Sequence, residues 1–175
     1  MSVTVALLRG INVGGKNSLP MAEWRAMLEG LGAEEVKTYI QSGNAVFRGE
    51  VGAGAISDAI ETEKGFRPHV LVLPLSSYEE VLDACPYAEQ GETDGKAVHV
   101  FFADGKPKQP DAAILALATE TEAVAVAGNT AFLLAPDGIG RSKLAAKLEK
   151  ALSVPVTARN WKSAVAIRAL GRGIA

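Results

Sequence analysis

One succession of predicted strands and helices occurs twice along this chain of 175 residues, and it limits the possible folds more than any other feature. Each copy consists of a strand, a helix, two strands joined by a tight hairpin, a second helix and a final strand, as the spacing of apolar residues indicates. The two hairpins have similar sequences, Ser-Gly-Asn-Ala-Val-Phe at residues 42–47 and Ala-Gly-Asn-Thr-Ala-Phe at 127–132. We therefore predict an α+β fold of two tandem ferredoxin-like (split β-α-β) subdomains.

The first copy covers residues 1–75 and the second covers 97–175, with 76–96 as the connection. The first is expected to have strands at 3–8, 36–41, 45–48 and 68–73 and helices at 20–31 and 55–64. In the connection, Ser77 and Glu80 form a capping box that predicts a short helix ended by Pro86, and residues 88–96 are expected to be a loop. The second copy is expected to have strands at 97–103, 122–127, 130–134 and 154–158, helices at 110–118 and 141–152, and an extra C-terminal helix at 160–170.

The composition excludes several classes of protein. A hydrophobic fraction of 48% with 22% charged residues excludes intrinsic disorder. The longest uncharged stretch, 123–136, has 14 residues, whereas a membrane span needs roughly 20, so no membrane association is expected. The single cysteine, Cys85, has no partner for a disulfide or a zinc site, and no secretion signal begins the sequence. We therefore expect a cytoplasmic protein in which Cys85 is a small buried apolar group.

Histidine spacing gives no reason to expect a metal or another cofactor. His69 and His99 lie in predicted strands and have no Cys or His neighbour at ligand spacing. Both are expected to be structural residues whose ring nitrogens have hydrogen-bond partners.

Charge is distributed unevenly along the chain. Residues 137–175 contain eight basic and two acidic residues, a net charge of +6, whereas residues 1–136 carry −8. A basic C-terminal quarter on an acidic body favours a local anion site over coating of nucleic acid by bulk charge. Lys147, Lys150 and Arg172 are interpreted as solvated helix residues.

The predicted topology brings two pairs of polar, glycine-rich segments together. Strands and helices alternate in direction in a split β-α-β unit, so the loop at 9–16 and the hairpin tip at 41–44 are expected at the same end of the first copy. By the same argument, the loop at 136–143 and the end of the last strand at 157–160 share the opposite end of the second copy. These two places are the predicted binding sites.

The second of these sites has the chemistry of an anion site. Gly140, Arg141, Ser142 and Lys143 form a turn that leads into a helix, where free N–H groups, a hydroxyl and two cations favour a phosphate or carboxylate. The neighbouring strand is followed by three further candidate residues: Arg159, Asn160 and Trp161. Arg159 is a candidate bidentate clamp. Trp161 is a candidate stacking face for a base, although core packing is the favoured interpretation for it.

The first site is predicted to present Arg9, Asn12 and Lys16 beside Gln41, Ser42 and Asn44. Residues 10–16 also fit the P-loop pattern G-x-x-x-x-G-K, but Asn17 stands where magnesium binding needs Ser or Thr. The predicted hairpins contradict the parallel sheet of a P-loop protein. A flexible glycine loop is therefore favoured over nucleotide hydrolysis.

Four segments resemble the signature segments of a largely bacterial family, domain of unknown function 1697. They are Ala-Leu-Leu-Arg-Gly-Ile-Asn-Val-Gly-Gly-Lys-Asn at 6–17, Thr-Tyr-Ile-Gln-Ser-Gly-Asn at 38–44, Gly-Ile-Gly-Arg-Ser-Lys-Leu at 138–144 and Thr-Ala-Arg-Asn-Trp at 157–161. The resemblance spans nearly the whole chain. It implies a two-subdomain α+β fold and supplies no activity.

Three functions follow from these observations. The leading hypothesis is a protein that binds an anionic, phosphate-bearing small molecule, such as a nucleotide, or a nucleic-acid end at the glycine-rich loops. The alternatives are a metal-independent enzyme on a small polar or carboxylated substrate, with Lys16 or Lys143 as acid/base or positioning cation, and a protein–protein adaptor that uses an exposed sheet edge. The sequence does not fix the catalytic residues or the oligomeric state.

Overall fold

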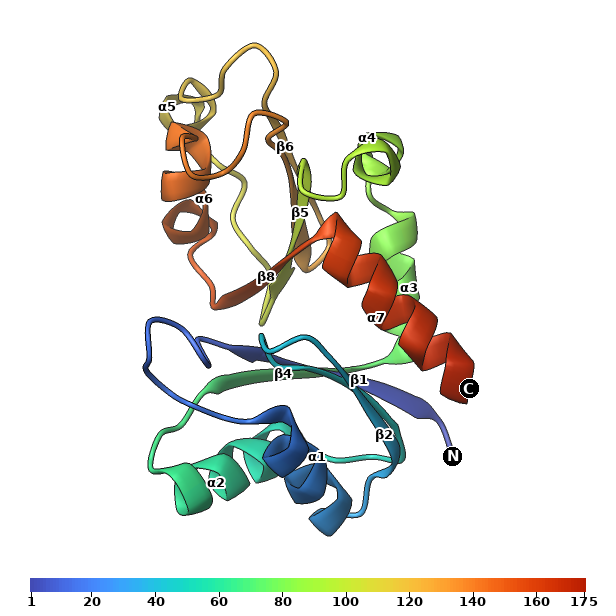
Figure 1. Ribbon diagram of the computed structural model, residues 1–175. Coiled ribbons are helices and arrows are strands. Elements are labelled where there is room, and N and C mark those ends of the chain that lie inside the picture. The colour runs from blue at the N-terminus through green and yellow to red at the C-terminus, as the bar shows by residue number, and fades with distance from the viewer. The chain divides into compact units, whose positions relative to one another are not determined.

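Two four-stranded antiparallel sheets with helices against them make up the chain, in a computed structural model that describes residues 1–175 (Figure 1). The strand order is β2-β3-β1-β4 in the first sheet and β6-β7-β5-β8 in the second, so the two copies have the same arrangement. The strands are β1 (Val3–Arg9), β2 (Glu34–Tyr39), β3 (Asn44–Arg48), β4 (His69–Pro74), β5 (Val98–Ala103), β6 (Ala123–Ala127), β7 (Thr130–Leu134) and β8 (Val156–Asn160). The helices are α1 (Met21–Gly30), α2 (Ala53–Lys64), α3 (Leu75–Asp83), α4 (Ala88–Thr93), α5 (Ala112–Leu115), α6 (Lys143–Leu152) and α7 (Trp161–Ile174).

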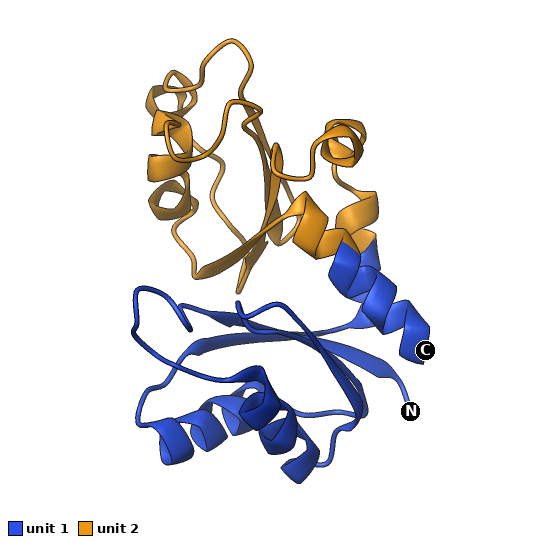
Figure 2. Ribbon diagram, in the orientation of Figure 1, with its two compact units in different colours: residues 1–79, 166–175 blue, residues 80–165 orange.

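Two compact units divide the chain (Figure 2). Residues 1–79 and 166–175 form the first unit, and 80–165 form the second. The second half of α7 belongs to the first unit because it contacts that unit at several points. Arg172 pairs with Glu79, and Arg48 Nη1 donates a hydrogen bond of 3.0 Å to the carbonyl of Ile174. The C-terminal helix is therefore divided between the units, whereas the sequence analysis assigned it wholly to the second subdomain.

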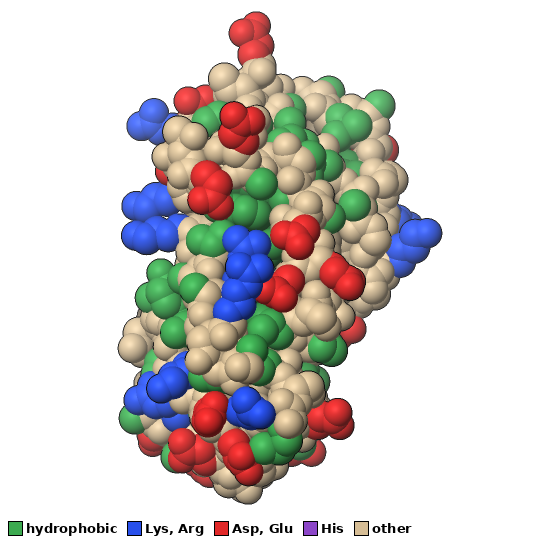
Figure 3. Space-filling model, turned by 90° about the vertical axis from the view of Figure 1, so that its right-hand side faces the viewer, with side chains coloured by type: hydrophobic (Ala, Val, Ile, Leu, Met, Phe, Trp, Pro, Cys, Tyr) green, Lys and Arg blue, Asp and Glu red, His purple; other side chains and the backbone are tan.

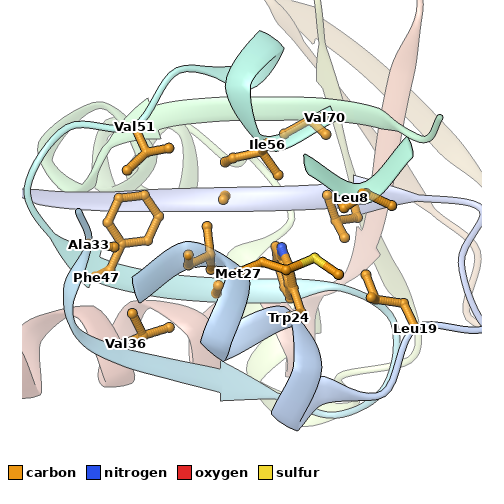
Figure 4. Close-up of a cluster of buried hydrophobic side chains, with 14 of the residues drawn as sticks. Leu8, Leu19, Trp24, Met27, Ala33, Val36, Phe47, Val51, Ile56 and Val70 are labelled. Carbon is orange, nitrogen blue, oxygen red and sulfur yellow. The ribbon is translucent and has the colours of Figure 1, made fainter. Parts of the chain in front are cut away.

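The first unit buries α1 and α2 against one face of its sheet (Figure 1). Figure 4 shows this core, in which Trp24 and Met27 of α1 point toward Phe47 and Leu8 of the sheet. Helical spacing places the buried side chains of α1 on one stripe, and Trp24 is fully buried. This packing fixes the N-terminal strand, and with it the loop that follows Arg9.

The second unit packs α5 and α6 against one face of its sheet (Figure 1). Leu144, Leu148 and Leu152 of α6 are fully buried at helical spacing against Phe101 and Leu133. Fully burying a leucine side chain contributes roughly 1.5–3 kcal/mol, so these three residues hold α6 firmly on the sheet. The position of the helix start at Lys143 is fixed by this core.

The connection between the copies differs from the sequence prediction. Residues 88–93 form helix α4, whereas a loop was expected, and α3 begins at Leu75, so Ser77 is not its N-cap. The polar sequence of α4 lacks apolar periodicity, but its Gly91 lies directly against the indole of Trp161. Tertiary packing therefore stabilises a helix that local sequence does not predict. None of the helices has both the length and the apolar character needed to cross a bilayer.

Candidate functional site

Hydrogen bonds join the two loops that the topology predicted to be close in the first unit. The side-chain Nδ2 of Asn12 donates to the carbonyls of Gln41 (2.8 Å) and Leu19 (2.9 Å), and its Oδ1 accepts from the N–H of Leu19 (2.7 Å). The N–H of Leu8 donates to the carbonyl of Gly43 at 2.8 Å. The predicted proximity of the loops is confirmed, and Asn12 is the residue that ties them together.

The hairpin tip is held by a second set of internal contacts. Asn44 is fully buried, and its Nδ2 donates to the carbonyl of Tyr39 (3.1 Å) and to Oγ of Ser42 (2.8 Å). Gly43 has a φ of 87°, and a Cβ placed on it would lie 2.6 Å from Cβ of Leu8. Asn12, Ser42 and Asn44, which were predicted to face a ligand, are therefore engaged within the protein, since internal hydrogen bonds satisfy them.

The exposed part of this cluster is a tight turn at residues 13–16. Lys16 N donates to the carbonyl of Val13 at 3.0 Å, and Gly14 and Gly15 both have positive φ, as a type I′ turn requires. Lys16 is exposed and has no ion pair. Arg9 and Gln41 are exposed at the same end of the sheet. This turn precedes α1 by several residues, and the sheets are antiparallel, so the loop is not a P-loop.

Ile40, beside Gln41, has an unusual backbone conformation. Its φ is 49°, a region that β-branched residues rarely occupy, and its side chain is 51% exposed. Val13, in the turn described above, is 66% exposed. Exposed apolar residues therefore occur on both loops of the first unit, and Ile40 also has a strained backbone.

The start of α6 forms the corresponding place in the second unit. Ser142 is the N-cap, and its Oγ accepts a hydrogen bond of 2.9 Å from the N–H of Ala145. The N–H groups of Lys143 and Leu144 have no acceptor in the protein. Arg141 and Lys143 are both exposed, and neither has an ion pair or a hydrogen bond from its side chain. Leu144 is fully buried, so the start of α6 presents one accessible free N–H group, that of Lys143, and two free cations.

The loop that leads into this turn is exposed over residues 136–141. Gly138 has a φ of 95°, which this glycine permits, and Gly140 has open space around its α carbon. Asp137 is not directed at the cations, because its Oδ2 accepts a hydrogen bond of 2.8 Å from Thr121. The loop is therefore open to a ligand at Gly140, and its one carboxylate is tied to Thr121.

Arg159 does not join Arg141, contrary to the sequence prediction. Val156 packs in the core under α6, and side chains three residues apart in a strand point to opposite faces of the sheet. Arg159 pairs across the strands with Val100, and neither residue is part of the core under α6. Only 9% of Arg159 is exposed. Its Nη1 donates to the carbonyl of Ala158 at 2.9 Å. The expected clamp of Arg141 and Arg159 is wrong for this reason.

Asn160 and Trp161 have structural roles. Oδ1 of Asn160 accepts a hydrogen bond of 2.8 Å from the N–H of Ser163, which caps the start of α7. Trp161 is 3% exposed, its Nε1 donates to Glu92 at 2.9 Å, and its ring packs on Gly91. The indole has no free face for a base, so core packing, the interpretation that the sequence favoured, is the one the structure supports.

His99 differs from the sequence prediction in its hydrogen bonding. It pairs with Leu133 on one side and with Asn160 on the other, at the end of the sheet from which the loop to α6 leaves. Its Nδ1 is buried and has no hydrogen-bond partner, whereas a satisfied histidine was expected. Burial lowers the pKa of His99 below its usual value of 6.5. His99 is therefore a neutral imidazole at neutral pH.

The comparisons with known proteins agree with the motifs. The family model described as "Protein of unknown function (DUF1697)" matches residues 1–132. The chain belongs to this family. The match includes the signature segments at 6–17 and 38–44, and those at 138–144 and 157–161 lie beyond it.

A solved structure has the same fold. A conserved bacterial protein from Streptococcus pneumoniae is 24% identical in sequence, with a TM-score of 0.66, and the match covers 97% of this chain and 98% of that one. This likeness shows the mixed α+β fold and nothing about activity. A search of curated proteins gave no match.

Proposed function

We propose that this protein binds a phosphate-bearing ligand, such as a nucleotide or a nucleic-acid end, at the start of α6. The observation that carries the proposal is the combination of two unpaired, exposed cations, Arg141 and Lys143, with the free and accessible N–H group of Lys143 at the start of α6. A helix N-terminus carries about half a positive elementary charge. Backbone donors and side-chain cations act together on an anion at such a place.

The ligand is assigned to α6 rather than to the loops of the first unit. In that unit the side chains of Asn12 and Asn44 are occupied by internal hydrogen bonds and Arg9 interacts within the protein, which leaves Lys16 as the exposed cation without a partner. A single exposed cation gives little affinity for an anion in water. The enzyme alternative also has less support, since Lys16 and Lys143 are both exposed, whereas a lysine acid/base is normally tuned by burial.

We extend the proposal to the fold and the compartment. The strand orders β2-β3-β1-β4 and β6-β7-β5-β8, with α1 and α2 on one face of the first sheet and α5 and α6 on one face of the second, support two ferredoxin-like subdomains. The single cysteine, Cys85, is a buried free thiol, which suits a reducing cytoplasm.

Isothermal titration tests the function. The full chain is titrated with pyrophosphate, nucleoside monophosphates and phosphosugars at low salt, together with the variants Arg141→Ala and Lys96→Ala. Lys96 is an exposed lysine of the same unit, far along the chain from α6, so it controls for the loss of one charge. We expect the affinity for at least one phosphate compound to fall about tenfold or more in Arg141→Ala, since a charge-assisted contact contributes about 1.5–3 kcal/mol. In Lys96→Ala the affinity for the same compound is expected to stay within about twofold of that of the unchanged protein. Equal affinities in the two variants would contradict the proposal.

A further inference from the structure

A groove lined by lysines lies between α5 and α6 of the second unit. It has a volume of about 490 Å³, and its wall includes three lysines, Lys108, Lys147 and Lys150, and one carboxylate, Asp111. Oδ1 of Asp111 accepts a hydrogen bond of 3.0 Å from the N–H of Ile114. The N–H of Lys108 donates to the carbonyl of Leu152 at 2.9 Å, which fixes the loop before α5 against the end of α6. The three ammonium groups therefore come from two segments that are held together by the backbone.

These lysines continue a line that begins at the proposed anion site. Leu144, Leu148 and Leu152 face the core, so Lys143, Lys147 and Lys150, at positions i, i+4 and i+7, share an outward stripe of the helix. Seven residues of α-helix rise about 10 Å. The cationic track, defined as Arg141, Lys143, Lys147, Lys150 and Lys108, thus runs from the helix start to the groove.

No member of the cationic track forms an ion pair or donates a side-chain hydrogen bond. Some cations elsewhere are neutralised, as in the pairs of Lys64 with Glu23 and of Arg172 with Glu79. Figure 3 shows the side of the molecule that carries α3, α4 and α7, where basic side chains lie next to acidic ones. Three unpaired cations on α6, with Arg141 before it and Lys108 across the groove, repel one another in the free protein, and a polyanion relieves that repulsion.

We infer that the ligand is a single strand of nucleic acid, with its terminal phosphate at the start of α6 and its next phosphates along the cationic track into the groove. This inference rests on the proposed function and names its substrate class. One strand of stacked nucleic acid rises about 3.4 Å per nucleotide, so a 10 Å track spans about three steps. The track is one side chain wide, which matches one strand and not the two backbones of a duplex.

The same surface predicts binding without sequence preference. The aromatic side chains of the second unit are not exposed, and the indole of Trp161 is packed on Gly91. Bases therefore have no exposed ring on which to stack, and contacts to phosphates carry no information about sequence.

Fluorescence anisotropy with labelled 5′-phosphorylated oligothymidylates of one to eight nucleotides tests the inference, with a blunt duplex as a further probe. We expect the affinity to rise with length up to about four nucleotides and then to level off. Single-strand binding has a salt slope of about 0.7 per neutralised phosphate. The variant Lys147→Glu/Lys150→Glu is therefore expected to lose at least about 1.4 from that slope and about tenfold or more in affinity for the tetranucleotide at 50 mM salt.

The matched control is Lys37→Glu/Lys96→Glu, which makes the same charge change at exposed lysines away from the track. Equal losses in the two double variants, or equal binding of the blunt duplex, would overturn the inference. If mononucleotide binding depends on Arg141 but does not grow with length, the proposed function stands and the single-strand assignment fails. If length-dependent binding needs Lys147 and Lys150 but ignores Arg141→Ala, the strand assignment stands and the terminal site at α6 fails. If no phosphate compound binds, both fail.

Discussion

Replacement of the hairpin glycines tests how the loops of the first unit are built. Gly43 and Gly128 occupy corresponding hairpin tips, and both have positive φ, 87° and 57°. A Cβ on Gly43 would meet Cβ of Leu8 at 2.6 Å and Cδ1 of Ile11 at 3.0 Å, whereas a Cβ on Gly128 would meet nothing within 4 Å. The two substitutions to alanine therefore differ chiefly in the close approach of the hairpin to β1.

The magnitudes follow from this difference. Positive φ costs an L-residue about 1–2 kcal/mol, and the stiffer unfolded chain returns about 0.4–1 kcal/mol, so Gly128→Ala is expected to lose about 1 kcal/mol. Gly43→Ala has the same loss and an overlap as well. Cβ of Leu8 is fixed to the backbone and cannot move aside, and overpacking of this kind costs about 1–3 kcal/mol. We expect Gly43→Ala to lose about 2–4 kcal/mol in total.

Urea unfolding followed by circular dichroism measures both free energies of unfolding, and amide hydrogen exchange shows where the loss occurs. We expect Gly43→Ala to speed exchange at Leu8, whose N–H is bonded to the carbonyl of Gly43, and Gly128→Ala to leave it unchanged. Equal losses of stability in the two variants would refute the close packing of the hairpin on β1.

Three further predictions concern single residues. Cys85 is 7% exposed, and burial raises the pKa of its thiol. Alkylation by iodoacetamide at pH 8, followed by mass spectrometry, is therefore expected to be slow in the folded protein and fast in urea. Fast alkylation of the native protein would contradict the burial of Cys85. The pKa of His99 is below 6.5 in the folded state, so the unfolded state takes up a proton first and stability falls as the pH drops from about 7.5 through 6.5. His99→Leu is expected to reduce the dependence of the melting temperature on pH over this range. An unchanged pH profile would contradict the burial of His99 as a neutral imidazole. Gly91→Ala places a Cβ 2.5 Å from Cγ of Trp161 and is expected to lower the free energy of unfolding by about 1–3 kcal/mol. Gly54→Ala in α2, with open space around it, is expected to be neutral or to raise that free energy by up to about 1 kcal/mol. Similar melting temperatures of the two variants would contradict the close packing of Gly91 on Trp161.

The repeated element order and the hairpin signals were sufficient to predict both sheets and the joining of the loops around Asn12 and Gln41. Local sequence determines a glycine turn and the direction of the next strand. The order of strands and helices then places the two loops at the same end of the sheet. The position of Arg159, away from Arg141, was predictable from the alternation of side chains along a strand. Val156 is apolar and Arg159 is three residues later, so the alternation of strand side chains already places them on opposite faces.

Other features depend on contacts that no local pattern shows. Helix α4 is polar throughout, and Gly91 lies against Trp161, which is 70 positions further along the chain. The groove between α5 and α6 likewise combines Lys108 with Lys147 and Lys150. The sequence predicted Lys147 and Lys150 to be solvated helix residues. Tertiary packing decides such features, so they become visible only in three dimensions.

The most direct test of anion binding at α6 is a titration of the ¹⁵N-labelled protein with pyrophosphate, followed in amide ¹H–¹⁵N correlation spectra. The N–H group of Lys143 is exposed and has no acceptor in the free protein, so the account predicts that its signal moves most and saturates. Amides that are already bonded in the sheet, such as that of Leu8, are predicted to stay in place. Saturating shifts elsewhere, with the signal of Lys143 unmoved, would contradict the account.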